Sequence, residues 1–210
     1  MIYIYYSYIA EDNCESLIKN ELPKFSSDFQ NRIKSYRRWQ DAQLSLLGRI
    51  ILFKAVDHIY NGKFQSREIE QTQYNKPYFK NGSIQFNISH SGEIVVCALC
   101  EKSQVGIDIE FITDVLIDDC KWQMTENEWL TLTSSDKIKE AFFGYWTQKE
   151  AVIKANGLGL SIPLKTFEVL EETAIIKGQK FFLKEIEIDE KYKCYIALDR
   201  EIDQICVRKI

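Results

Sequence analysis

The sequence predicts an α+β fold with strands and at least one long helix in each half of the chain. Runs of β-branched and aromatic residues predict the strands. Apolar residues that recur every three or four positions predict the helices. No Pro-, Gly- or Ser-rich linker separates the halves, so we expect residues 1–104 and residues 105–210 to pack together as one unit.

The N-terminal half, residues 1–104, is expected to combine a small group of strands with one long helix. The helix is expected over residues 28–60, where apolar side chains such as Leu47, Ile51 and Ala55 form a stripe. Strands are expected over residues 2–8, 84–88 and 94–100, with residues 89–92 as a polar hairpin connection.

The C-terminal half, residues 105–210, repeats this order in a looser form. Thr125 and Glu128 match a capping box, which predicts that a helix begins there. A longer helix is expected over residues 136–155, because Asn156 and Gly157 suit a left-handed helix end. Strands are expected over residues 104–111 and near residues 166–170, 181–188 and 194–198.

Composition and charge exclude several classes of protein. The 210-residue chain has a formal net charge of −4, which argues against nucleic acid as a partner. The sequence contains no apolar run of about 18 residues, the length that spans a membrane. Its first residues lack a basic leader and a small-residue cleavage site. We therefore expect a cytoplasmic protein whose partners include neither nucleic acid nor a membrane.

Six cysteines are scattered along the chain, and we expect them to be reduced thiols. Cys97 and Cys100 form a C-x-x-C pair, a spacing that also occurs in zinc and redox sites. The pair lies in an apolar run, however, without two further ligands at matching spacing. A strand would direct the two side chains to opposite faces, so we expect both to belong to strand core.

Two carboxylates share one face of the strand expected at residues 105–111. Strand geometry places Gly106, Asp108 and Glu110 on this face, with the two acids about 7 Å apart along the backbone. An acidic strand face can simply be solvated. Gly106 favours a site, since a glycine inside a strand often marks the close approach of a ligand or of another backbone. Mg²⁺ binds one or two carboxylates together with water and phosphate oxygens, and suits such a pair.

A third acid is offered by the long helix expected over residues 136–155. Helical spacing places Trp146, Glu150 and Lys154 on one face of that helix. The alternative is an ordinary surface ion pair between Glu150 and Lys154, which would add little to stability.

Hydroxyl groups and a histidine lie in the polar segment of residues 87–92. His90 is flanked by Ser89 and Ser91, and this group of donors suits a phosphate. A histidine in a turn is more often structural, so this segment alone is weak evidence. The other histidine, His58, lies within the first long helix and is expected to belong to the core or the surface.

Three motifs follow one another at separations that are hard to obtain by chance. They read FNISHSG over residues 86–92, VGIDIE over residues 105–110 and WTQKEAVIK over residues 146–154. Together they resemble the Sfp-type 4′-phosphopantetheinyl transferase family. Asn75-Lys76-Pro77 resembles the G-K-P segment of that family, with asparagine where glycine is usual.

The resemblance implies a fold and an activity. The fold would consist of two similar halves packed as a pseudo-twofold unit, each with a small, mostly antiparallel sheet and a long helix. The activity would be Mg²⁺-dependent transfer of the 4′-phosphopantetheine moiety of coenzyme A to a serine of an apo acyl or peptidyl carrier protein. Adenosine 3′,5′-bisphosphate would be released, and we expect the enzyme to be a monomer.

The resemblance assigns the metal and the pyrophosphate to the C-terminal half, residues 105–210. By motif position, Asp108, Glu110 and Glu150 would bind Mg²⁺, and Lys154 would contact the coenzyme A phosphates. Glu150 and Lys154 would be the catalytic residues. Either Glu150 itself or a metal-bound water would accept the proton of the carrier serine.

The N-terminal half, residues 1–104, would bind the adenosine end of coenzyme A. Ser89 and His90 would hold the 3′-phosphate, and Lys76 would lie near the adenine. One departure concerns the first long helix, where family members commonly carry an arginine that helps to hold the 3′-phosphate and this chain carries Leu44. The candidates for a replacement base are Arg32, Lys34 and Arg38.

Two other functions would use the same residues. A Mg²⁺-dependent hydrolase would use the three acids to cleave a nucleotide pyrophosphate with water. A non-catalytic module would bind coenzyme A or a carrier protein without turnover. The presence of all three acids together with Lys154 favours the transferase.

Overall fold

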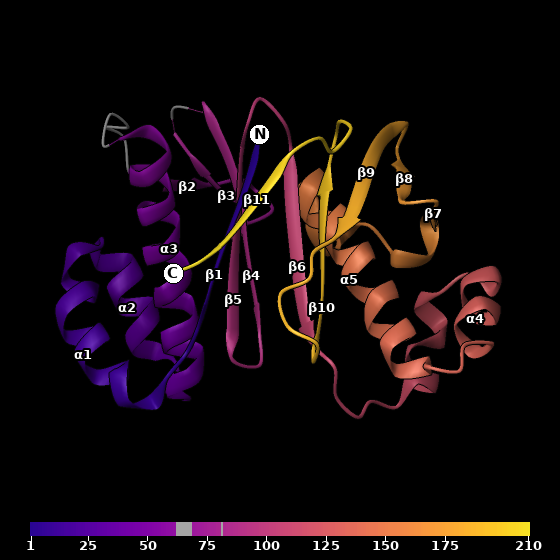
Figure 1. Ribbon diagram of the computed structural model, residues 1–210, viewed down its shortest axis with the longest axis horizontal. Coiled ribbons are helices and arrows are strands. Elements are labelled where there is room, and N and C mark those ends of the chain that lie inside the picture. The colour runs from indigo at the N-terminus through magenta and orange to yellow at the C-terminus, as the bar shows by residue number, and fades with distance from the viewer. Residues whose placement is uncertain (62–68, 81) are drawn as a thin grey trace.

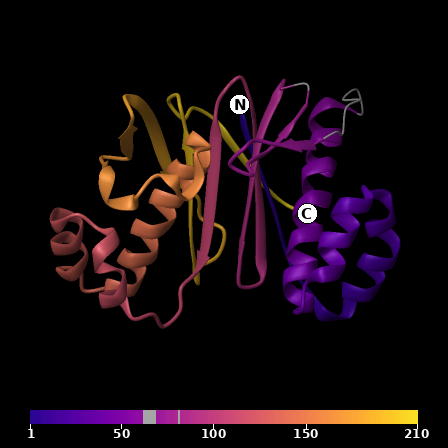
Figure 2. The same ribbon diagram turned by 180° about the vertical axis from the view of Figure 1, so that it is seen from behind.

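The computed structural model describes residues 1–61, 69–80 and 82–210. Helices lie toward both ends of the molecule, and most of the strands lie between them (Figure 1), an arrangement also visible from behind (Figure 2). Within the described ranges, no helix is both long enough and apolar enough to cross a membrane. The helices are α1 (Glu11–Glu21), α2 (Ser27–Ser35), α3 (Trp39–Tyr60), α4 (Glu126–Thr133) and α5 (Ile138–Asn156), with short 3-10 helices at Leu22–Lys24, Ile117–Gln123, Gly159–Ser161 and Leu164–Thr166.

The strands form two sheets and a separate hairpin. The first sheet contains, in spatial order, β11 (Ile205–Lys209), β1 (Ile2–Tyr8), β5 (Ile94–Glu101) and β4 (Ile84–Ser91). The second contains β6 (Val105–Phe111), β10 (Tyr192–Leu198), β9 (Gln179–Glu185), β8 (Thr173–Ile176) and β7 (Val169–Leu170). The hairpin pairs β2 (Ile69–Gln71) with β3 (Pro77–Phe79). Strand pairs are antiparallel throughout these elements apart from β1 and β11, which are parallel.

The two sheets pack on each other, and one long helix covers the outer face of each. The layer between the sheets contains Ile4 from β1 and Ile107 from β6. Leu52 of α3 belongs to the apolar layer outside the first sheet, and Val152 of α5 belongs to the layer outside the second. The result is the expected α+β fold, in which two similar halves form a pseudo-twofold unit.

The last strand of the chain joins the sheet of the N-terminal half. β11 runs parallel to β1, with Ile2 opposite Ile205 and Tyr6 opposite Lys209. This strand was absent from the sequence prediction, because Ile205–Lys209 is short, partly exposed and ends in two basic residues. The partner that makes it a strand lies about 200 residues away, and local sequence carries no sign of it.

The helix expected over residues 28–60 is in fact two helices. Tyr36 is extended, with φ −66° and ψ 136°, and separates α2 from α3. The break lets α2 fold back so that its Ile33 is buried against Leu46 and Ile50 of α3. The apolar spacing continues across the break, so periodicity alone gave no sign of it. The sequence also gave no prediction for β8 or for α1, whose only buried residue is Cys14.

Strand β4 is longer than expected and includes most of the segment that was assigned to a polar connection. The strand continues to Ser91, and the chain turns at Gly92, whose φ is +55°. Side chains therefore alternate along this segment. The side of β4 that faces β6 carries Asn87, Ser89 and Ser91, whereas His90 lies on the side of α3. This alternation decides which of these side chains lie beside the acids of β6.

Several local predictions are confirmed. Thr125 and Glu128 form the expected capping box at the start of α4. Gly157 ends α5 with a φ of +81°, as a left-handed cap requires. Cys97 and Cys100 are buried on opposite faces of β5, one toward α3 and one between the sheets, and neither forms a disulfide.

Candidate active site

Helix α5 packs directly on the face of β6 that carries the two acids. A β-carbon at Gly106 would lie 2.1 Å from the carbonyl oxygen of Ala151 and 2.3 Å from the amide nitrogen of Ala155. Gly106 therefore marks the close approach of another backbone, which was one of the two roles that the sequence left open. This contact brings Glu150 and Lys154 of α5 to the acidic face.

Lys154 connects the helix to Asp108. Its Nζ lies 2.5 Å from Asp108 Oδ1 and donates a hydrogen bond of 2.9 Å to Ser89 Oγ. Ser89 Oγ in turn donates to Asp108 Oδ1 at 2.9 Å. The Asp108 side chain is only 4% exposed, and its Oδ2 has no hydrogen-bond partner among the described residues. A buried carboxylate oxygen without a partner is costly, and a bound cation would remove that cost.

The other two acids carry pKa values above their usual range. Burial raises the pKa of Glu110, with the charges of Asp108 and Glu150 adding to the effect, while the hydrogen bond from Ser91 and the charge of Lys154 oppose it. Burial likewise raises the pKa of Glu150, against the charge of Lys154 and with that of Asp108. The three carboxylates thus repel one another, and a cation between them would favour their charged forms.

Side chains of β4 bind the edge of β6, although the two strands belong to different sheets. Asn87 Oδ1 accepts a hydrogen bond of 2.8 Å from the Ile107 amide. Ser91 Oγ accepts one of 3.1 Å from the Phe111 amide and donates one of 2.7 Å to Glu110 Oε2. Because no backbone ladder pairs β4 with β6, these side chains supply the acceptors that the β6 edge needs.

Comparison with known proteins gives a consistent result. A sequence model described as 4′-phosphopantetheinyl transferase superfamily matches residues 104–201, and one described as 4′-phosphopantetheinyl transferase, N-terminal, matches residues 17–102. The 4′-phosphopantetheinyl transferase gsp of Aneurinibacillus migulanus is 36% identical over 177 residues, which cover 80% of this chain and 74% of the relative. The chain belongs to the Sfp-type 4′-phosphopantetheinyl transferase family.

Two further relatives come from Bacillus subtilis and Xenopus laevis. The 4′-phosphopantetheinyl transferase Sfp of Bacillus subtilis (strain 168) is 28% identical over 182 residues, which cover 82% of this chain and 81% of the relative. An L-aminoadipate-semialdehyde dehydrogenase-phosphopantetheinyl transferase of Xenopus laevis is 29% identical over 208 residues, covering 84% of this chain and 68% of the relative. These relatives identify the chain as a transferase enzyme.

The transferase brings together most of the residues that the sequence singled out. Ser89, Asp108 and Lys154 are in direct contact, and the charges of Glu110 and Glu150 act on this group. Two further functional roles were not predicted, that of Asn87 and that of Ser91 as a partner of Glu110. The signal that could have revealed them is the alternation of Asn87, Ser89 and Ser91 along β4, which places all three on one side of that strand.

His90 lies on the opposite face of β4 from Ser89. Its ring is exposed, yet partial burial lowers its pKa, and the positive charges of Lys154 and Arg32 act in the same direction while Asp41 opposes them. The charges of two basic side chains from different elements therefore act on this histidine. Such a cluster of positive charge suits an anionic ligand.

Arg32, one of the three candidate replacement bases, is bound to the residue that follows Leu44. Leu44 is 3% exposed and belongs to the apolar layer between α3 and the first sheet. Arg32 of α2 donates a hydrogen bond of 3.0 Å to Ser45 Oγ and lies over the Phe29 ring, 5.0 Å from its centre. Among the three candidate bases, Arg32 is the one whose charge acts on His90.

Lys76 directs its ammonium group into the protein. The Nζ donates hydrogen bonds to the carbonyl oxygens of Val105 at 3.2 Å, Lys154 at 2.7 Å and Ala155 at 3.1 Å. Burial lowers the pKa of Lys76 to about 8. The preceding residue, Asn75, has a φ of +63°, which explains why glycine is usual there in the family.

The donor set suits Mg²⁺, although the acids do not form a finished coordination shell. Within residues 1–61, 69–80 and 82–210, no three carboxylate, imidazole or thiol side chains stand close enough to hold a metal ion as they are. Lys154 occupies one oxygen of Asp108, and Ser91 holds Glu110. The three carboxylates, among them the unpartnered Oδ2 of Asp108, nevertheless provide the hard oxygen ligands that Mg²⁺ prefers.

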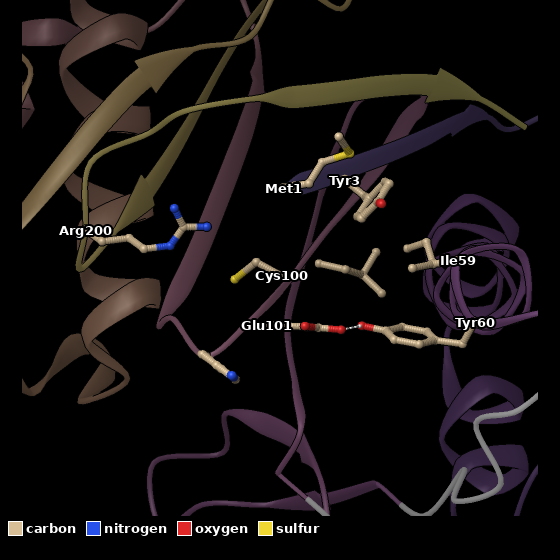
Figure 3. A pocket seen from close by; sticks show the side chains of 9 residues that line it. Met1, Tyr3, Ile59, Tyr60, Cys100, Glu101 and Arg200 are labelled. Atoms are coloured by element: carbon tan, nitrogen blue, oxygen red, sulfur yellow. Dashed lines mark hydrogen bonds between the residues drawn. The ribbon is translucent and has the colours of Figure 1, made fainter.

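A separate hollow of about 390 Å³ lies at the C-terminal end of β5, around Cys100 and Glu101 (Figure 3). Its lining includes Tyr3, Cys100 and Arg200, and across it Tyr60 donates a hydrogen bond of 2.7 Å to Glu101 Oε1. None of the residues that the sequence assigned to the site lines this hollow. It is distinct from the acidic cluster.

Truncating Asn87 should destabilise the fold measurably. Asn87→Ala would leave the buried Ile107 amide without its acceptor, which costs about 1–3 kcal/mol. Urea unfolding followed by tryptophan fluorescence would measure the loss. Gln85→Ala is a suitable control, because Gln85 lies on the same strand and its amide donates to the Gly82 carbonyl at the surface. Equal stability of the two variants would contradict the role of Asn87 at the β6 edge.

Proposed function

We propose that this enzyme transfers the 4′-phosphopantetheine moiety of coenzyme A to a serine of an apo carrier protein, in a Mg²⁺-dependent reaction that releases adenosine 3′,5′-bisphosphate. The observation that carries the proposal is the buried contact of Lys154 with Asp108, beside Glu110 and Glu150. A cation and three acids on two adjoining elements suit the handling of a pyrophosphate.

Asp108, Glu110 and Glu150 would hold Mg²⁺. When bound, the ion would offset negative charge on the pyrophosphate. Glu110 and Glu150 would bind it in their charged forms, which burial otherwise disfavours. Lys154 would then leave Asp108 and contact the phosphates of coenzyme A, and Ser89 would be released with it.

The reaction is a direct displacement at phosphorus. The carrier serine attacks the phosphorus attached to pantetheine, and the bond from this phosphorus to the bridging oxygen of the pyrophosphate breaks. Adenosine 3′,5′-bisphosphate leaves with the bridging oxygen, and the serine keeps phosphopantetheine as a phosphodiester. Glu150 accepts the serine proton, either directly or through a water that it orients. A carboxylate bound to Mg²⁺ is a weak base, which favours the route through a water.

The two halves of the sequence would divide the substrate between them. Residues 1–104 would bind the adenosine end, with Ser89 and His90 at the 3′-phosphate and Lys76 near the adenine. We further propose that Arg32 supplies the charge that Leu44 cannot. Residues 105–210 would bind the metal and the pyrophosphate.

We propose that the enzyme works as a monomer in the cytoplasm. Its partners would be coenzyme A and an apo acyl or peptidyl carrier protein, and neither nucleic acid nor a membrane. The net charge of −4 and the pI near 5.4 support leaving nucleic acid out of the partners, because a nucleic-acid-binding domain is usually basic.

A transfer assay tests the proposal. The purified chain is mixed with coenzyme A, Mg²⁺ and a panel of apo carrier proteins, and the mass of each intact carrier is measured by mass spectrometry. We expect a gain of one phosphopantetheine on at least one carrier, and chelation of the metal should abolish it. Release of adenosine bisphosphate without a modified carrier would favour hydrolysis instead. Tight coenzyme A binding without either product would favour a non-catalytic module.

A further inference from the structure

Lys76 links the N-terminal half to the backbone of both elements that carry the acids. Its ammonium group contacts the Val105 carbonyl at the start of β6 and the carbonyls of Lys154 and Ala155 in the last turn of α5. Val105 stands three positions before Asp108 in the sequence. One side chain therefore holds the start of the acidic strand against the end of the helix.

The end of α5 needs a group of this kind. The last four carbonyls of a helix have no partner inside the helix. The cap satisfies one acceptor, as the Gly157 amide donates to the Ile153 carbonyl at 2.9 Å. Lys76 satisfies the next two, and its positive charge lies at the negative end of the helix dipole.

The backbone around Lys76 is fitted to this contact. Lys76 belongs to a tight turn in which Thr72 Oγ1 accepts a hydrogen bond of 3.2 Å from the Lys76 amide, and the Thr72 amide donates one of 3.0 Å to the Lys76 carbonyl. On the helix side, a β-carbon at Gly157 would lie 3.2 Å from Cδ of Lys76. The stem of the lysine thus runs against the cap of α5 with little space to spare.

We propose that Lys76 is a positioning residue for the reaction: by joining β6 to the end of α5, it fixes the spacing between Asp108 and Glu150. This inference rests on the proposed function, since that function requires both acids on one metal ion. Lys76 itself touches neither the metal nor the reacting phosphorus.

In this proposal, the ammonium group of Lys76 does not contact coenzyme A. An ammonium has three N–H donors, and three carbonyl acceptors surround it. Binding a phosphate through Nζ would require these hydrogen bonds to break. Only the aliphatic stem of Lys76 is left to lie near the adenine.

The test compares Lys76→Met with the wild-type enzyme in three measurements. First, kcat should fall about tenfold or more while the KM for coenzyme A changes less than about threefold, because misplaced acids slow the chemical step. Second, the affinity for adenosine 3′,5′-bisphosphate should stay near the wild-type value. Third, amides of residues 150–157 should exchange hydrogen faster, since the last turn of α5 loses its cap. If Lys76→Met does not fold, Lys76→Gln, which keeps two donors, replaces it.

Lys80→Met serves as the matched control. Lys80 lies just after β3 in the same hairpin and is exposed, 3.4 Å from Glu70. This variant should keep wild-type kinetics and exchange. A large loss of adenosine bisphosphate affinity in Lys76→Met with kcat retained would overturn the proposal, and so would unchanged exchange over residues 150–157. The hydrogen-exchange comparison tests the contact of Lys76 with the end of α5 even if the wild-type chain transfers no phosphopantetheine. Failure of the proposed function and failure of this inference can therefore be told apart.

Discussion

The Glu150→Gln variant is expected to lose transfer by a factor of about 10²–10⁴, the range typical of removing a general base. Glutamine has nearly the same shape as glutamate, so the half-buried side chain should still pack against β6. The amide cannot accept the serine proton, however, and it is a weaker ligand for Mg²⁺ than a carboxylate. The initial rate of holo-carrier formation would measure the loss, and circular dichroism would show that the fold is retained.

A neutral control lies on the same helix. Glu140→Gln removes a carboxylate from the first turn of α5, where Glu140 pairs with Lys137 at 3.1 Å on the surface. Such a pair contributes roughly 0–1 kcal/mol to stability, and this variant should transfer at the wild-type rate. Near-wild-type transfer by Glu150→Gln in the presence of Mg²⁺ would remove Glu150 from the proposed site.

The Gly106→Ala variant is expected to damage stability and transfer together. The added methyl group would meet the backbone of Ala151 at 2.1 Å and of Ala155 at 2.3 Å. Backbone atoms cannot rotate aside, so α5 would have to move away from β6, at a cost of about 3 kcal/mol or more. Glu150 and Lys154 would move with the helix. Denaturant unfolding would report the first effect and the transfer assay the second.

Gly144→Ala, a matched substitution within α5, is expected to raise the stability of the protein. No described atom outside the surrounding turns of the helix lies within 4 Å of a β-carbon at Gly144. Alanine is a better helix former than glycine, so this variant should gain about 0.5–1 kcal/mol of stability. If Gly106→Ala were as stable as Gly144→Ala, the close contact between α5 and β6 would be wrong.

The acidic cluster could be predicted because simple periodicities place its members. Two-residue spacing puts Asp108 and Glu110 on one face of a strand, and four-residue spacing puts Glu150 and Lys154 on one face of a helix. The sequence also flagged Gly106, but it left a ligand and a backbone as equal explanations. Only the packing of α5 on β6 distinguishes them.

Features that depend on distant contacts could not be predicted in this way. The break at Tyr36 lets Ile33 pack against α3, and the apolar spacing is the same on both sides of the break. The ammonium of Lys76 meets carbonyls that lie about 30 and 80 residues further along the chain. Backbone carbonyls are common to every residue, so the sequence gives no sign of which ones a lysine will reach.

The pairing of β1 with β11 constrains how the protein can fold as it is synthesised. β1 is synthesised about 200 residues before its neighbour on one edge, which is made of residues 205–209. Until these residues emerge, that edge of β1 offers free backbone groups to any passing strand. The N-terminal sheet can therefore begin to form on the nascent chain, but it is completed only after residues 205–209 have been synthesised.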